Sequence, residues 1–277
     1  MTERTIDAAG TEMFVRDSGD GPPVLLLHGF PQTGRCWDRI AEGLASDHRV
    51  VAPDLPGYGR SARPPSYRAR ALGDVVAKLM DAVGAPRATV VGHDWGGAVA
   101  IRLALDHPDR VENLVVVNSP FRKMDFKRGW HMLFFNLPVL PEAAFTLGGN
   151  RLLPWAIRAG SARKDAVAPE AMAEYVAAYR TLERQRSAFA YYRTITRETL
   201  KRKLPLPGRT GGSPRRIAAR TMVIWGERDP LLPPHLLGGF AGIPDIRIER
   251  LPDVGHFVPE EAPEETVAFL RSFLAPE

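Results

Sequence analysis

One acidic residue stands where a nucleophile would be presented to a substrate. Residues 90–98 form a pattern of a short apolar strand, a tight turn with the sequence Gly-His-Asp-Trp-Gly, and a helix of small residues. This strand–turn–helix pattern holds one side chain up at the corner, and here it is the carboxylate of Asp94. Attack by a carboxylate on an ester would give an anhydride, whereas attack on a saturated carbon gives an ordinary ester. Asp94 therefore favours displacement at an alkyl carbon.

Two further residues complete an ordered catalytic set. Asp229 lies in Gly-Glu-Arg-Asp-Pro after a predicted strand, and His256 lies in Gly-His-Phe after the last one. His256 would take a proton from the water that hydrolyses the ester, and Asp229 would orient the imidazole. Each residue follows a strand, where open α/β sheets place their sites. Glu227 competes with Asp229 for the role of the acid, and Asp-Pro is also a common turn pair.

Hydrolysis of the ester builds an oxyanion, which backbone N–H groups must stabilise. The segment His-Gly-Phe-Pro at 28–31 follows the apolar run 24–27, so it belongs to a loop after a buried strand. The residue after the nucleophile, Trp95, is expected to supply one N–H donor. Phe30 is the candidate for the second donor, although Gly-Phe-Pro on its own would also fit an ordinary turn.

The elements around these residues alternate between strands and helices. Residues 1–20 are expected to form a hairpin, and apolar runs at 49–52, 88–91 and 113–117 predict further strands. Helices are predicted at 37–45 and at 67–83, where the second ends before Gly84. This alternation predicts an α/β fold with a mostly parallel sheet and helices on both of its faces.

The alternation stops near Pro120. We expect residues 121–205 to form an inserted helical cap, with helices at 171–185 and 187–200. Residues 206–216, rich in Gly, Pro and Arg, would lead back to the core, which consists of residues 1–120 and 206–277. Strands at 221–225 and 245–250 and a last helix at 263–274 complete the prediction.

Four motifs together resemble the epoxide hydrolase branch of the α/β-hydrolase family. They are His-Gly-Phe-Pro at 28–31, Asp-Leu-Pro-Gly-Tyr-Gly at 54–59, Gly-His-Asp-Trp-Gly-Gly at 92–97 and Gly-His-Phe at 255–257. The resemblance covers essentially the whole chain and implies an α/β-hydrolase fold with an Asp nucleophile. Haloalkane and fluoroacetate dehalogenases share much of this pattern, so the motifs alone leave the leaving group open.

The cap should decide between these reactions, because an epoxide oxygen leaves as an alkoxide and needs a proton. The resemblance implies two cap tyrosines as O–H donors. Tyr192 matches the second, with Tyr191 as the alternative, but the segment 130–138 places His131 where the family usually has the first tyrosine. An imidazole N–H can also donate to an epoxide oxygen, and a histidine that only packs in the cap is an equally open reading.

Release of a halide would need N–H donors around an ion that takes no proton. Trp95 fits both kinds of enzyme, but Phe30 stands where haloalkane dehalogenases usually have Asn or Glu. Trp95 also stands where fluoroacetate dehalogenases typically have Arg. Trp130 and Trp155 are alternative donors, although tryptophans at helix contacts more often serve packing. The candidate substrate-binding side chains are Phe134, Trp155 and Tyr191, which predict an apolar pocket.

Charge and composition indicate which partners and which cellular location to expect. The 277 residues have a net charge of +5, and lysines and arginines at 201–216 form the densest basic stretch. No recognition motif accompanies it, so nucleic acid is not an expected partner. No run of about eighteen apolar residues predicts a membrane span. The single cysteine, Cys36, and the absence of an apolar leader after Met1 fit a cytoplasmic protein. The sequence leaves the oligomeric state open, a homodimer included.

The sequence therefore predicts a cofactor-independent epoxide hydrolase that takes a small apolar epoxide and water. No metal is expected, because the remaining histidines lack spacings such as H-E-x-x-H, and no glycine-rich phosphate loop is present. Two alternatives stay open: a haloalkane or haloacetate dehalogenase with the same nucleophile, and a non-catalytic hydrolase scaffold that binds a ligand.

Overall fold

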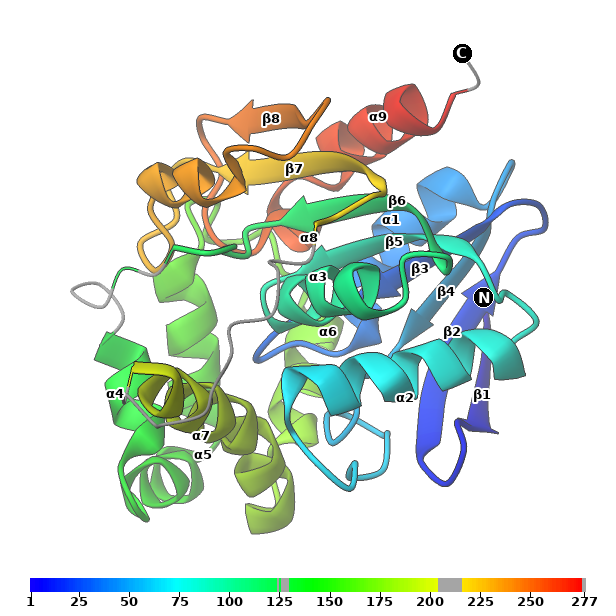
Figure 1. Ribbon diagram of the computed structural model, residues 1–277. Helices are drawn as coiled ribbons and strands as arrows, with labels where there is room; N and C mark the ends of the chain where they lie inside the picture. Colours follow the sequence, from blue (N-terminus) through cyan, green and yellow to red (C-terminus); the bar gives the residue numbers. More distant parts are fainter. Residues whose placement is uncertain (124, 126–129, 204–215, 276–277) are drawn as a thin grey trace.

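The chain folds around a mixed sheet of eight strands in the order β1-β2-β4-β3-β5-β6-β7-β8 (Figure 1). The computed structural model describes residues 1–123, 125, 130–203 and 216–275. The pairs β1–β2 and β2–β4 are antiparallel, and the remaining pairs are parallel. The strands are β1 (Thr2–Asp7), β2 (Glu12–Ser18), β3 (Pro23–Leu27), β4 (Arg49–Pro53), β5 (Ala88–His93), β6 (Val111–Val117), β7 (Arg220–Gly226) and β8 (Arg247–Leu251).

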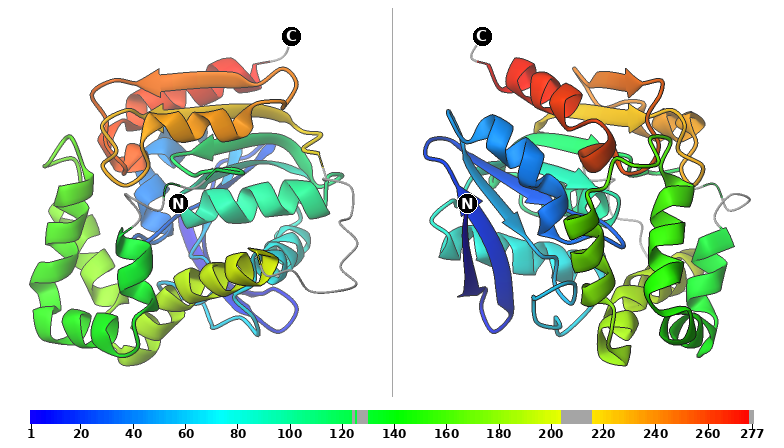
Figure 2. Two further views of the ribbon diagram at one scale, coloured as in Figure 1. Left: turned by 60° about the vertical axis from the view of Figure 1, so that its left-hand side comes forward. Right: turned by 180° about the vertical axis from the view of Figure 1, so that it is seen from behind.

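Helices cover both faces of this sheet, which confirms the predicted α/β class. The helices α2 and α3 pack together on one face, and α1 and α9 pack together on the other, as the view from behind shows (Figure 2). The core helices are η1 (Gly34–Trp37), α1 (Asp38–Leu44), α2 (Ala69–Ala82), α3 (Trp95–Asp106), η2 (Pro234–Phe240), α8 (Val258–Glu261) and α9 (Pro263–Leu274).

The apolar runs of the sequence become the centre of the sheet. Val90 and Val91 in β5 and residues 114–117 in β6 are fully buried, as expected for strands covered on both faces. α2 buries the face predicted from its periodicity and ends before Gly84, which has a φ of +70°. The amide of Ala85 then donates to the carbonyl of Met80, so the helix end is closed by a glycine turn.

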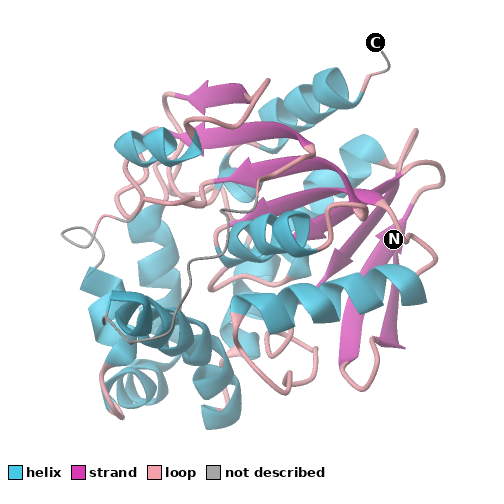
Figure 3. Cartoon of the chain, in the orientation of Figure 1, coloured by secondary structure: helices cyan, strands magenta, loops and turns pink. Residues whose placement is uncertain are grey.

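Within the described residues, four helices between β6 and β7 form a separate layer, which we call the cap (Figure 3). It lies at the carboxyl ends of the parallel strands (Figure 1). The predicted cap runs from 121 to 205: its first residue is described, whereas residue 205 and most of the predicted return at 206–216 lie outside the described residues. No helix in the described ranges is long and apolar enough to cross a membrane. The cap helices are α4 (Trp130–Asn136), α5 (Leu140–Gly160), α6 (Pro169–Ala178) and α7 (Leu182–Lys203).

The predicted helix at 171–185 is wrong, because α6 ends at Ala178 and α7 begins at Leu182. At the break, the side-chain amide of Gln185 donates to the carbonyl of Tyr179 at 3.0 Å, so that carbonyl has a partner outside the helix. The Tyr179 ring is buried and lies 5.4 Å from the ring of Phe30 in the core. Packing of an aromatic ring against the core therefore ends a helix whose apolar periodicity continues.

Polar contacts hold the cap on the core. The guanidinium of Arg16 in β2 donates to both carboxylate oxygens of Glu174 in α6, at 2.9 and 3.0 Å. Next to it, the Tyr175 hydroxyl donates to Glu260 in α8. The Tyr175 contact is buried and the Arg16 contact is partly buried, and together they join α6 to β2 and α8 of the core.

The turn from β5 into α3 brings backbone segments very close together. A Cβ atom on Gly96 would lie 2.1 Å from the carbonyl oxygen of Leu27, and one on Gly92 would lie 2.3 Å from the carbonyl oxygen of Gly96. Backbone atoms cannot give way as a flexible side chain would. The glycines therefore let the start of α3 lie directly against β3 and β5.

We expect Gly96→Ala to lower the free energy of unfolding by about 3 kcal/mol, because the added methyl group overlaps the Leu27 carbonyl. Gly73→Ala in α2 is the matched control, since its Cβ would meet the nearest atom at 3.6 Å. The control should keep or raise stability by up to about 1 kcal/mol. Urea denaturation of both variants checks this, and equal stabilities would contradict the stated role of Gly96.

Candidate active site

The carboxylate of Asp94 lies at the corner between β5 and α3. Its backbone has a φ of 51° and a ψ of −116°, a conformation that is uncommon for a residue with a side chain. The amide of Phe30 donates to its Oδ1 at 2.9 Å, and the amide of Trp95 also hydrogen-bonds the carboxylate. A Cβ atom on Gly29 would lie 2.5 Å from Oδ1, so a glycine is needed there. Both predicted oxyanion-hole donors thus meet the Asp94 carboxylate.

His256 lies between the two predicted aspartates. Its Nδ1 is 2.7 Å from Oδ2 of Asp229, and its Nε2 is 3.7 Å from Oδ2 of Asp94. The first distance is a hydrogen bond, and the second is longer than one. Glu227, the competing acid, instead pairs with Arg250 at 3.1 Å. The structure therefore brings Asp94, Asp229 and His256 together in the predicted order.

A residue that the sequence analysis missed holds Asp229. The side-chain amide of Asn118, at the end of β6, donates to Oδ2 of Asp229 at 2.7 Å. The backbone amides of Leu231 and Leu232 donate to Oδ1 at 2.7 and 2.9 Å. Burial alone would raise the pKa of Asp229, but the His256 charge and these donors outweigh it and lower that pKa. The acid is therefore a carboxylate that only accepts hydrogen bonds.

The imidazole of His256 is buried, which alone would lower its pKa, but the negative charges of Asp229 and Asp94 raise that pKa to about 9. Burial also raises the pKa of Asp94, against the charge of His256 and the two backbone amides. The resting pair is thus an imidazolium beside a carboxylate. Anything that removes the Asp94 charge also removes part of the stabilisation of the imidazolium.

A cavity with two lobes lies between the core and the cap. One lobe has a volume of about 90 Å³ and the other about 230 Å³, and both are lined by Asp94, His131 and Tyr192. The larger lobe also reaches Phe30 and His256. No group of three His, Cys, Asp or Glu side chains in the described part of the chain could hold a metal ion. The lining is otherwise mostly apolar.

The two predicted cap donors face this cavity. The Tyr192 hydroxyl has a pKa raised well above its usual value by burial and by the negative charge of Asp94, so it carries its proton at neutral pH. Burial and the His256 charge lower the pKa of His131 to about 4, so its imidazole is neutral. Their rings lie 6.2 Å apart, nearly perpendicular. Both side chains therefore keep a proton that can be donated.

The other predicted cap residues lie less close to the nucleophile. The Tyr191 hydroxyl donates to the carbonyl of Pro56 at 2.8 Å, so the alternative donor is bonded within the core–cap contact. Phe134 packs against Phe135, and Phe135 rather than Phe134 lines the larger lobe, which corrects that assignment. Trp155 borders the same lobe with 60% of its surface exposed, at the rim. The side chain of Trp130 lies outside what the structure describes.

Comparison with known proteins finds a matching family and related enzymes. A family described as "alpha/beta hydrolase fold" matches residues 22–263. The chain belongs to the α/β-hydrolase family. This hydrolase is 31% identical to a fluoroacetate dehalogenase from Burkholderia sp, over 98% of this chain and 93% of the relative. It is 29% identical to haloalkane dehalogenase 2 from Mycobacterium tuberculosis, over 96% and 92% of the two chains.

Solved structures show the same fold for this hydrolase. The structure of the epoxide hydrolase CorEH without ligand matches with a TM-score of 0.85 and 25% identity, over 99% of each chain. The relatives thus include both epoxide hydrolases and dehalogenases, which confirms the family predicted from the motifs. They leave the bond that this hydrolase breaks to be argued from its own site.

We expect Asp94→Asn to lower the pKa of His256 below about 9, because the amide removes one of the two carboxylate charges that favour the imidazolium. NMR titration of the His256 ring measures this. Asp253→Asn is the control, since that carboxylate lies in the same loop but pairs with Arg228 at the surface. A midpoint in Asp94→Asn equal to that of the control would contradict the electrostatic coupling of Asp94 to His256.

Proposed function

We propose that this hydrolase opens epoxides to vicinal diols through a covalent ester on Asp94. The observation that carries the proposal is the Tyr192 hydroxyl, which stays protonated and lines both lobes of the cavity beside the Asp94 carboxylate. A nucleophile on one side and a proton donor on the other are what the opening of a three-membered ether ring requires. His131 is the second candidate donor.

In the first step, a carboxylate oxygen of Asp94 attacks one epoxide carbon, and the bond from that carbon to the ring oxygen breaks. The ring oxygen takes the proton of the Tyr192 hydroxyl and becomes the first alcohol of the product. The result is a neutral hydroxyalkyl ester on Asp94 and a phenolate on Tyr192. Loss of the Asp94 charge lowers the pKa of His256, so the imidazolium releases its proton through solvent to the Tyr192 phenolate and the neutral imidazole forms.

In the second step, His256 takes a proton from water, and the hydroxide attacks the ester carbonyl carbon. The negative charge that develops on the carbonyl oxygen meets the amides of Phe30 and Trp95. The tetrahedral intermediate then expels the alkoxide, which takes the proton back from His256 and leaves as the diol. The carboxylic acid on Asp94 then gives its proton to His256, which restores the imidazolium–carboxylate pair, so the cycle consumes one water.

The lining of the cavity favours a neutral substrate. Neither lobe is lined by a lysine or arginine among the residues that the structure describes. A haloacetate would bring a second carboxylate next to Asp94, where the cation of the described lining, the His256 imidazolium, already lies between the Asp229 and Asp94 carboxylates. An uncharged apolar epoxide meets no such penalty, and side chains such as Leu231, Leu232 and Phe135 suit its hydrocarbon part. We therefore expect haloacetates to be poorer substrates than epoxides.

A haloalkane dehalogenase is the second candidate, because a haloalkane is also neutral and the Trp95 side chain borders the smaller lobe beside Asp94. The relatives of similar identity include such enzymes. A non-catalytic scaffold is the weakest candidate, since a binding protein has no need of the buried hydrogen bond between Asp229 and His256.

We expect a single turnover in ¹⁸O-labelled water to place the label in the Asp94 carboxylate, because the hydroxide attacks the ester carbonyl of the enzyme. Mass spectrometry of the Asp94 peptide measures this. His256→Gln should still form the ester but hydrolyse it at least about a hundredfold more slowly, so the alkylated protein accumulates. Label that appears only in the diol, with none in the protein, would rule out the covalent route.

We expect Tyr192→Phe to reduce the turnover of styrene oxide by about a hundredfold or more, because the alkoxide loses its proton donor. Turnover of a haloalkane would be little changed, since halide leaves without a proton. Tyr191→Phe is the matched control and should keep its activity while losing about 1 kcal/mol of stability with the Pro56 hydrogen bond. Halide release by the wild type with no diol from any epoxide would favour the dehalogenase instead.

A further inference from the structure

The side chain of Glu261, five residues after His256, gathers backbone amides from two parts of the chain. Its Oε1 accepts from Phe257 at 3.0 Å, and its Oε2 accepts from Gly255 at 2.9 Å. The same Oε2 accepts from Ala162 and Arg163, just beyond the cap helix α5, at 2.7 and 2.9 Å. Glu261 is 3% exposed, so this is a buried carboxylate with four N–H donors.

Two of these donors flank the imidazole of His256. The backbone of His256 itself is fixed by two other contacts: its amide donates to the carbonyl of Gly160 at 2.9 Å, and its carbonyl accepts from Nε2 of His93 at 2.8 Å. The backbones of Gly255, His256 and Phe257 are therefore each held by a hydrogen bond. Among the residues that the structure describes, Glu261 alone binds the residues on both sides of His256.

The cap and the His256 loop also meet without space between them. A Cβ atom on Gly255 would lie 2.5 Å from both the carbonyl oxygen of Gly160 and the amide nitrogen of Ala162. One on Gly160 would lie 2.8 Å from the ring of Phe257. The end of α5 and the loop of His256 thus form one packed unit, with the Glu261 carboxylate bonded to both.

We infer that Glu261 is a positioning residue for His256, which fixes the loop of the imidazole against the end of the cap helix α5. The inference rests on the proposed role of His256 as the base that activates water. Glu261 does not touch the cavity and acts only through the backbone on either side of the imidazole. It is placed to set the direction of Nε2 toward the ester on Asp94.

The arrangement requires a carboxylate rather than an amide. Both oxygens accept from N–H groups, so a glutamine would have to turn its NH₂ group toward at least one backbone amide. With its oxygen kept toward the three donors at Oε2, the NH₂ group would face the amide of Phe257, next to the imidazole. Glu261 also adds negative charge near the ring, which raises the pKa of His256 as the charges of Asp229 and Asp94 do.

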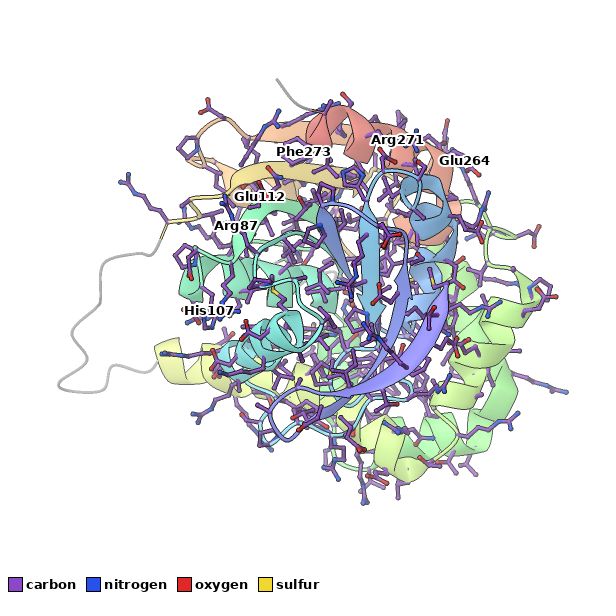
Figure 4. The ribbon with its side chains drawn as sticks, turned by 90° about the vertical axis from the view of Figure 1, so that its right-hand side faces the viewer. Arg87, His107, Glu112, Glu264, Arg271 and Phe273 are labelled. Carbon is purple, nitrogen blue, oxygen red and sulfur yellow. The ribbon has the colours of Figure 1, made fainter. Side chains whose placement is uncertain are left out.

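The test compares Glu261→Gln with Glu264→Gln in the full-length protein. Glu264 lies three residues further on at the surface of α9, near Arg271, and pairs with Arg39 (Figure 4). In Glu261→Gln, we expect the alkylation of Asp94 by styrene oxide to stay within about twofold of wild type. Hydrolysis of the ester should slow by about ten- to a hundredfold, the scale expected for a misplaced catalytic group. Glu264→Gln should match wild type in both steps.

A second measurement does not depend on the reaction. The proton on Nδ1 of His256, in its hydrogen bond to Asp229, should give a downfield NMR signal in wild type and in Glu264→Gln. In Glu261→Gln we expect that signal to move upfield or broaden. If wild type forms no ester on Asp94, the proposed reaction fails, but this signal still tests whether Glu261 positions the imidazole.

Three outcomes would overturn the inference: hydrolysis at the wild-type rate, equal losses in alkylation and hydrolysis, or an unchanged Nδ1 signal in Glu261→Gln. Equal losses would indicate a general loss of folded protein. If Glu261→Gln yields no folded protein, Glu261→Asp replaces it, because it keeps the charge but shortens the reach by one methylene. The shorter side chain should slow hydrolysis and leave alkylation unchanged.

Discussion

The active site depends on a chain reversal that takes one residue. β5 ends at His93 and α3 begins at Trp95, so Asp94 alone makes the turn, with a positive φ. Such a turn is possible because glycines let the start of α3 lie against the backbone of β3. The same turn directs the carboxylate toward the amide of Phe30 and out toward the cap. Every other feature of the site is placed relative to this side chain.

The charge of the catalytic side chains differs between the core side and the cap side of the site. On the core side, His256 lies between two carboxylates that favour its charged form. On the cap side, Tyr192 and His131 are uncharged and still carry protons. This separation gives the two halves of the proposed reaction to different groups. The core side forms and hydrolyses the ester, while the cap side supplies a proton to the departing oxygen.

The parts of this site that depend on local sequence could be predicted from it. Asp94, Asp229 and His256 each follow a strand within a short motif, and their chain order is enough to bring them together. Asn118 could not be found in this way, because nothing in its own segment indicates that it contacts Asp229. Glu261 was missed for the same reason, since a glutamate in an acidic stretch looks like solvated surface until its four amide partners are known.

The cap was predicted less well than the core, because helix periodicity fixes a face but not its neighbours. Phe134 and Phe135 are adjacent and both apolar, and only the packing of α4 decides that Phe135 reaches the cavity. Tyr191 and Tyr192 differ in the same way, one bonded to Pro56 and the other lining both lobes. The break at Tyr179 likewise comes from a contact with Phe30, far away in the sequence.

The contact between α5 and the loop of His256 has a consequence for exchanging caps among relatives. The carbonyl of Gly160 is the acceptor for the amide of His256, so the last turn of that cap helix also fixes the backbone of His256. In a chimaera that takes its whole cap from another enzyme, the residue that accepts from the His256 amide would come from that other enzyme. Recombination of such enzymes to alter substrate range should therefore keep the junction at 160–163 with the parent that supplies the histidine.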